Sequence, residues 1–185
     1  MNLKMKKLIM VVSSLVILLA IIMIYYCNIY TIETVDEDVI YTMIKESRER
    51  SEDAVPSKIT IRSTKMVDNR LIVLITHEDS LGIVCLEKGM NGKFRFDLWS
   101  LDDTGKKYKF RPYYIKDKDY FITAGKKNTP QAAYVEVTVG DMMYKTKIPD
   151  TEYFIVPIQI RDRNQSTGIP MVRLYDENNN AILNK

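Results

Sequence analysis

An uncharged apolar run lies near the beginning of this chain. Residues 8–27 contain no charged side chain, and only Ser13 and Ser14 interrupt the apolar pattern. A helix of this length rises about 30 Å, which matches the thickness of a bilayer's hydrocarbon core. The run therefore predicts a helix that crosses a membrane once.

Two other fates of such a segment are a cleaved signal peptide and a lipid-attachment signal. A cleavage site needs small residues after the apolar stretch, whereas this run ends in the bulky residues 22–26. Cys27 follows Tyr26, at a position where a lipid-attachment signal has a small residue. Tyrosines suit the membrane interface instead, where amphipathic rings lie at headgroup level. We therefore predict an uncleaved signal-anchor over residues 1–30.

The charges beside the anchor predict its orientation. Lys4, Lys6 and Lys7 precede the apolar run, and residues 33–38 bring four acidic side chains with no basic one before Lys45. Basic flanks stay in the cytoplasm according to the positive-inside rule. The predicted localisation is thus the cell membrane, with a cytoplasmic amino terminus and an extracytoplasmic remainder.

Composition limits what that remainder does. The three lysines before the run account for the formal charge of +3, so the rest balances 24 basic against 24 acidic residues. A nucleic-acid-binding domain is normally strongly basic, so no nucleic-acid partner is expected. Two cysteines predict no disulfide framework, and one histidine excludes a multi-histidine zinc site. We expect no metal and no cofactor, and no catalytic motif is recognisable.

Residues 31–57 form an acidic segment in which we predict a stalk helix. Thr34 and Glu37 have the spacing of a capping box, which places a helix start at Thr34. Apolar residues then recur three and four positions apart, which is typical of one helix face. This face packs on the following domain or binds a partner helix, and its candidate residues are Val39, Ile40, Met43 and Ile44.

From residue 58 onward the apolar pattern changes to the period of two that is typical of strands. Asn91-Gly92 predicts a hairpin within residues 82–101, and Gly140-Asp141 predicts an antiparallel pair. Further strands are predicted at 58–62, 70–76, 108–115, 119–124, 133–139, 142–148, 153–160 and 171–175. Short strands at this spacing predict a mainly β domain over residues 58–185, an antiparallel β-sandwich or a partly open barrel.

One segment, residues 104–130, mixes eight basic residues with six aromatic ones. Lysines attract anions over long distances and rings supply stacking or interfacial contact, so the segment is a candidate binding site for an anionic polymer or for headgroups. The candidate residues are Lys106, Lys107, Lys109, Arg111, Tyr113, Tyr114 and Lys116. The alternative is ordinary strand alternation, with the rings in the core and the lysines in water.

Two smaller patterns have structural interpretations. Asp176, Asn178 and Asn180 have the spacing of a calcium loop, but Ala181 takes the place of the turn glycine, so a polar hairpin turn is favoured. Cys85 alternates with Ile83 in an apolar run and is therefore expected in the core.

Several stretches resemble a known class of proteins. These are the lysine-flanked anchor, LEKGMNGKF at residues 86–94, YFITAGKKN at 120–128, YVEVTVGDMMYKTKI at 134–148 and LYDENNNAI at 174–182. Together they are similar to uncharacterised single-pass membrane-anchored extracytoplasmic proteins of Gram-positive bacteria. The resemblance implies an envelope location and a β-rich domain, and it assigns no activity.

The sequence thus favours a membrane-anchored binding or interaction module of the cell envelope, facing an anionic envelope polymer, a membrane surface or a protein partner. A different hypothesis is an envelope enzyme that uses dispersed carboxylates such as Glu87, Asp97 or Asp141 as general acid and base. A third makes the chain an accessory subunit of a membrane complex, bound through the stalk helix.

Overall fold

The structure, a computed structural model, describes residues 3–48, 58–101, 108–115, 118–127, 132–160 and 170–182. Antiparallel sheets dominate these residues and do not close into a barrel, which confirms the predicted mainly β class. The chain divides into two compact units. One contains Met1–Thr34 and Lys88–Arg95, and the other contains Val35–Glu87 and Phe96–Lys185.

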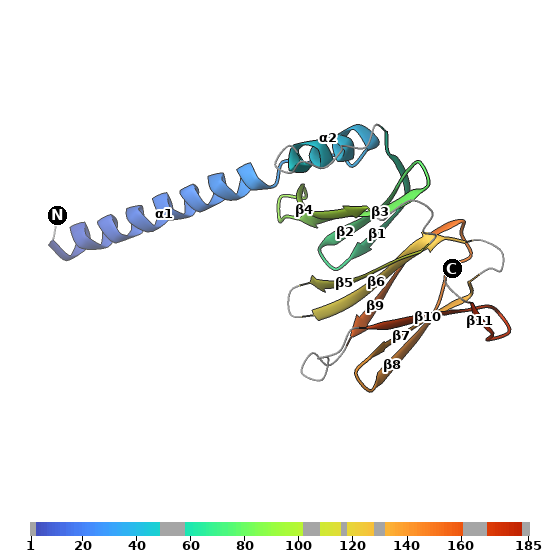
Figure 1. Cartoon of the computed structure of the whole chain (residues 1–185). Coiled ribbons are helices and arrows are strands. Elements are labelled where there is room, and N and C mark those ends of the chain that lie inside the picture. Colours follow the sequence, from blue (N-terminus) through green and yellow to red (C-terminus); the bar gives the residue numbers. More distant parts are fainter. Residues whose placement is uncertain are drawn as a thin grey trace. The chain divides into compact units, whose positions relative to one another are not determined.

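In the first unit, helix α1 (Leu3–Ile29) is the predicted apolar helix, drawn in blue in Figure 1. It is long and apolar enough to cross a membrane, and none of its most apolar window is buried inside the protein. Ser13 and Ser14 donate their hydroxyl protons to the carbonyls of Ile9 and Met10, one turn earlier. The two polar side chains of the apolar run are thus hydrogen-bonded within the helix.

The first unit also joins the end of α1 to the turn at Lys88–Arg95. The Tyr26 and Tyr30 rings stack with centroids 4.5 Å apart, and the Tyr26 hydroxyl accepts a 2.6 Å hydrogen bond from the Met90 N–H. Ile32 and Phe94 exchange two backbone hydrogen bonds of 3.0 and 2.8 Å. The chain that leaves the helix is therefore paired with the turn as a short antiparallel bridge.

The second unit begins with helix α2 (Glu37–Arg48). Its N-cap is Asp36, whose carboxylate accepts a 2.9 Å hydrogen bond from the Val39 N–H. The capping box predicted from Thr34 is therefore wrong in register by two residues. Glu37 is the first helical residue, and its carboxylate accepts a 3.0 Å hydrogen bond from the Ile61 N–H of the first strand instead of returning to the cap.

The strands of the second unit form three antiparallel sheets, with the β3–β4 turn contributed to the first unit (Figure 1). Sheet A has the order β1-β2-β3-β4, sheet B the order β5-β6-β9, and sheet C the order β11-β10-β7-β8. The bounds are β1 Thr60–Val67, β2 Arg70–His77, β3 Ser80–Lys88, β4 Phe94–Leu101, β5 Tyr108–Ile115, β6 Lys118–Lys126, β7 Tyr134–Val139, β8 Met142–Lys147, β9 Tyr153–Ile160, β10 Met171–Tyr175 and β11 Ala181–Ile182.

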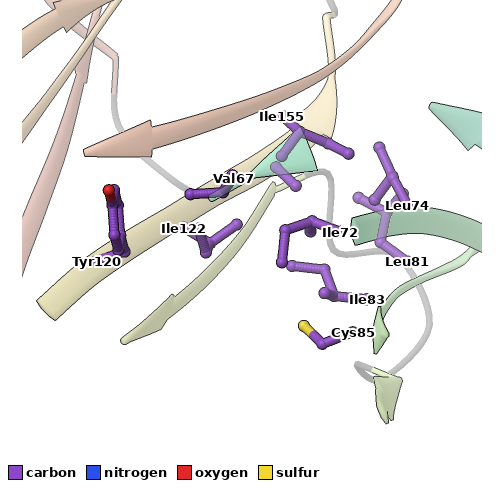
Figure 2. Packing of buried hydrophobic residues seen from close by; sticks show 10 residues of the cluster. Val67, Ile72, Leu74, Leu81, Ile83, Cys85, Tyr120, Ile122 and Ile155 are labelled. Carbon is purple, nitrogen blue, oxygen red and sulfur yellow. The ribbon is translucent and has the colours of Figure 1, made fainter. Parts of the chain in front are cut away.

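A first core lies between sheets A and B. Figure 2 shows its side chains from β2 and β3 with those of β6 and β9. Its members are Val67, Ile72, Leu74, Leu81, Ile83, Cys85, Tyr120, Ile122, Ala124 and Ile155. Cys85 is 1% exposed, so the predicted core position of this thiol is confirmed.

A second core lies between sheets B and C. It takes alternate residues from the same two strands of sheet B, namely Phe121 of β6 and Phe154, Val156 and Ile158 of β9. On the sheet C side it contains Val135, Val137, Val139 and Leu174. Sheet B is therefore the middle layer of three and is covered on both faces, which explains why its strands are apolar in consecutive positions.

The predicted hairpins are present, with one change in turn geometry. β7 and β8 pair across Gly140, whose φ is 58°. The β3–β4 turn is longer than two residues: Gly92 donates to the Gly89 carbonyl, Gly89 donates to the Lys93 carbonyl, and Gly92 has a φ of 80°. Asn91-Gly92 thus marks the turn correctly, but only the glycine takes the left-handed conformation that favours glycine.

Candidate functional site

The predicted basic and aromatic segment is only partly within the described residues. Lys106, Lys107 and Lys116 lie outside them. The other four candidates are on β5, where the register pairs Lys109 with Ala124, Arg111 with Ile122, Tyr113 with Tyr120 and Tyr114 with Asp119. Binding by these residues stays a prediction.

The later part of that segment is core. Tyr120, Phe121, Ile122, Thr123 and Ala124 on β6 are each at most 9% exposed. Tyr108, at the start of β5, packs its ring at 6.2 Å from that of Phe154, and burial raises the pKa of its hydroxyl. The rings of this segment that the structure describes therefore follow the alternative of ordinary strand alternation.

A second surface with the same chemistry lies on the outer face of sheet C. Residues that alternate with the second core point to the opposite side of the sheet. The register across β10, β7 and β8 aligns them in three rows: Tyr175–Tyr134–Lys147, Arg173–Glu136–Lys145 and Met171–Thr138–Met143. We call these nine residues the sheet C outer face.

Lys145 lies at the centre of the aromatic part of this face. Its ammonium is 4.4 Å from the centroid of the Tyr175 ring and 5.3 Å from that of Tyr134, and it donates a 2.9 Å hydrogen bond to the Asn179 side chain. Each exposed cation–π contact stabilises by about 0.5–1 kcal/mol. The two rings and the charge are therefore held together as one group on the sheet surface.

The electrostatics of the face are cationic. Lys145, Lys147 and Arg173 are exposed, whereas the one carboxylate of the three rows, Glu136, is 7% exposed and accepts a 3.1 Å hydrogen bond from the Tyr175 hydroxyl. Met143 and Met171, 65% and 59% exposed, extend the same face. An extended anionic chain would meet cations, ring faces and apolar side chains in adjacent rows.

The carboxylates named for the enzyme hypothesis do not form an acid–base pair. Glu87 and Asp97 both approach the same nitrogen of Arg70, at 3.2 and 2.9 Å, and Glu87 also accepts a hydrogen bond from Asn69. Two groups that share one guanidinium form an ion-pair cluster on sheet A. Asp141 is exposed in the β7–β8 turn, on a different sheet.

The candidate partner face of α2 is partly inside the protein. Ile40 and Ile44 are 0% exposed, and Val39 and Met43 are half-buried. The two most buried residues of this helix face therefore fit the alternative in which α2 packs on its own domain. Binding of a partner helix through Val39 and Met43 stays a prediction.

The predicted turn at Asp176 is present between β10 and β11. The Asp176 carboxylate accepts hydrogen bonds from the N–H groups of Asn178 and Asn180 and from the Asn180 side-chain amide, at 2.8–3.0 Å. Its oxygens are thus used inside the turn. Within the described ranges, no group of three or more His, Cys, Asp or Glu residues is placed to hold a metal ion.

The sequence contained a signal for the sheet C outer face. Glu136 and Lys145 are equidistant from the Gly140-Asp141 turn, so the predicted hairpin already aligns them. The sequence did not indicate that β10 pairs with β7. This pairing adds Arg173 and Tyr175 to the face. Comparison of this chain with family models, with curated proteins and with solved structures found no match.

Proposed function

We propose that this chain is a single-pass membrane protein that holds a β-rich binding module at the outer face of the cell envelope. The observation that carries the proposal is α1, a helix of 27 residues whose large apolar side chains are exposed from Met5 to Tyr25. So large an apolar surface is stable in a bilayer and aggregates in water.

The orientation rests on charge. Three lysines precede the apolar run, and the segment after α1 is acidic, which is the bias that retains the amino terminus in the cytoplasm. The resemblance to anchored extracytoplasmic proteins of Gram-positive bacteria supports the same placement. The three-layer domain then lies on the extracytoplasmic side of the membrane, within the cell envelope.

The ligand class we propose is an anionic envelope polymer, bound on the sheet C outer face. Its three exposed cations attract polyanions, and Tyr134 and Tyr175 offer ring surface beside them. Such binding is electrostatic and exposed, so salt weakens it.

The test uses the full-length chain in lipid nanodiscs, incubated with isolated Gram-positive cell walls. We expect co-sedimentation at low salt and loss of it at high salt. The triple variant Lys145→Glu, Lys147→Glu, Arg173→Glu should lose retention. A matched control, Lys45→Glu, Lys58→Glu, Lys65→Glu, changes the same charge at exposed positions outside sheet C and should retain it.

A further variant separates the two candidate surfaces. Glutamate at Lys106, Lys107, Lys109 and Lys116 tests the segment predicted from sequence. Loss of binding in this variant alone would move the site to residues 104–130. Co-sedimentation that survives in both variants would reject both surfaces as the binding site, and no co-sedimentation of the unchanged chain at either salt would reject the polymer.

Topology has its own test, on a Cys27→Ser background. A membrane-impermeant maleimide applied to intact cells should label Met143→Cys, because Met143 is exposed, and should spare Lys4→Cys. The reverse pattern would reject the proposed orientation. Labelling of both positions would reject the anchor.

A further inference from the structure

The tip of the β3–β4 turn carries an isolated apolar side chain. Met90 is 87% exposed, more than any other large apolar residue that the structure describes, including those of α1. The turn beneath it is well ordered by hydrogen bonds, with Gly92 bonded to Gly89 and Gly89 to Lys93. An ordered turn therefore presents a methionine to its surroundings.

The turn is fixed to one end of α1. Besides the hydrogen bond from the Met90 N–H to the Tyr26 hydroxyl, the Asn91 side chain donates a 3.1 Å hydrogen bond to the Tyr30 carbonyl. Gly89 lies against the Tyr30 ring so closely that an added Cβ would be 2.7 Å from two of its carbons. When α1 lies in a bilayer, the depth of Tyr26 in that bilayer consequently sets the depth of Met90.

Tyr26 belongs to the last turn of the apolar run. The run ends at Cys27, so a spanning helix places Tyr26 at the boundary between acyl chains and headgroups. Tyr25 beside it is 69% exposed. An apolar side chain held beside Tyr26, as Met90 is, would therefore contact lipid acyl chains.

The charges around the tip fit the same level. Lys88, Lys93 and Arg95 are close to Met90 in the sequence, and Glu33 is paired with Lys93 at 2.6 Å. Arg95 lies over the Tyr30 ring, 5.3 Å from its centroid. Basic side chains with long apolar stems are suited to lipid phosphates.

We propose that this turn is a second membrane contact, in which Met90 enters the outer interface of the bilayer and Lys88 and Lys93 face phospholipid headgroups. The contact rests on the proposed membrane anchoring by α1. Its occupant is the bilayer in which α1 lies.

The experiment places a nitroxide spin label at single cysteines of the full-length chain on a Cys27→Ser background, since Cys85 is 1% exposed and shielded from the reagent. The chain is reconstituted in phosphatidylcholine–phosphatidylglycerol vesicles. Collision with oxygen and with a water-soluble nickel chelate reports the depth of each label. The positions are Val16→Cys in mid-helix, Tyr25→Cys as the interface reference, and Met90→Cys.

We expect the label at position 16 in the acyl core and the label at 90 at the depth of the label at 25. A core label at 16 with an aqueous label at 90 would overturn the second contact and leave the anchor intact. An aqueous label at 16 would overturn both. Gly89→Ala, which pushes on the Tyr30 ring, should move the label at 90 toward water, whereas Ser80→Ala should not.

Discussion

Arg70 shows how much one side chain decides in this fold. Its side chain is 14% exposed and forms ion pairs with both Glu87 and Asp97. The side chains of these two residues are 15% and 29% exposed. The three residues come from three neighbouring strands of sheet A. Removal of the arginine leaves two partly buried carboxylates without their common partner.

We expect Arg70→Met to lower the free energy of unfolding by about 2 kcal/mol, below the 3–5 kcal/mol typical of fully buried pairs because water reaches Asp97. The thermal midpoint should fall by about 4–8 °C for a chain of this size. Thermal unfolding of the detergent-solubilised chain, followed by circular dichroism, measures this midpoint. Lys65→Met, exposed on β1, should change it little.

Asp176 gives a prediction about pH. The Asn180 side-chain amide and then the Asn180 N–H donate to its carboxylate, and these hydrogen bonds lower the pKa of Asp176. A lowered folded pKa means that the turn is stabilised above the ordinary aspartate value of about 3.9 and loses this stabilisation as the pH falls through the lower folded value. Amide exchange at Asn178 and Asn180 should accelerate in that range. In Asp176→Asn this pH dependence should be absent.

At the scale of elements, α2 belongs with the β domain. Two of its residues, Ile40 and Ile44, are 0% exposed, and its first residue bonds the backbone of β1. Val73, Val84 and Leu86 are also 0% exposed although they lie outside both cores, so the second face of sheet A is covered as well.

Ile44→Ala should therefore destabilise the chain by about 2–5 kcal/mol through loss of buried volume, whereas Lys45→Ala at the next, exposed position should have little effect. Urea unfolding followed by circular dichroism distinguishes them. An unchanged midpoint for Ile44→Ala would favour the partner-helix alternative. Cysteines at Val39 and Met43 would then be expected to crosslink to a partner in cells.

The elements were largely predictable because their signals are local. The apolar helix α1 follows from residues 8–27. Apolar alternation bounded by turn residues located the strands from β1 to β10, since these patterns need no knowledge of distant residues. The two-residue β11, which pairs only with β10, carried no such signal. The α2 cap was misplaced because Thr34 and Asp36 both satisfy cap chemistry.

The candidate surfaces were less predictable because they depend on non-local pairing. Arg70 meets Glu87 and Asp97 only once β2, β3 and β4 are adjacent. The sheet C outer face requires β10 to pair with β7, across more than thirty residues. Composition alone pointed to residues 104–130, where binding stays a prediction, and it could not show that β6 within this segment is buried on both faces.

At the scale of the whole β domain, two cores share the strands β6 and β9. Loss of packing in either core would uncover one face of β6 and β9. The other core packs on the opposite face of the same strands, so it would be destabilised as well. Ile122→Ala in the first core and Val156→Ala in the second should therefore both lower one common unfolding transition. Calorimetry that resolved two transitions, each shifted by one variant, would contradict this coupling.

The middle sheet also sets where the chain tolerates substitution. β6 has neighbours on both edges and cores on both faces, so none of residues 120–124 faces solvent. β8 has one covered face and one open face, and its exposure alternates along the strand. A saturation mutagenesis scan should accordingly find an unbroken intolerant block in β6, with permissive and restricted positions alternating in β8.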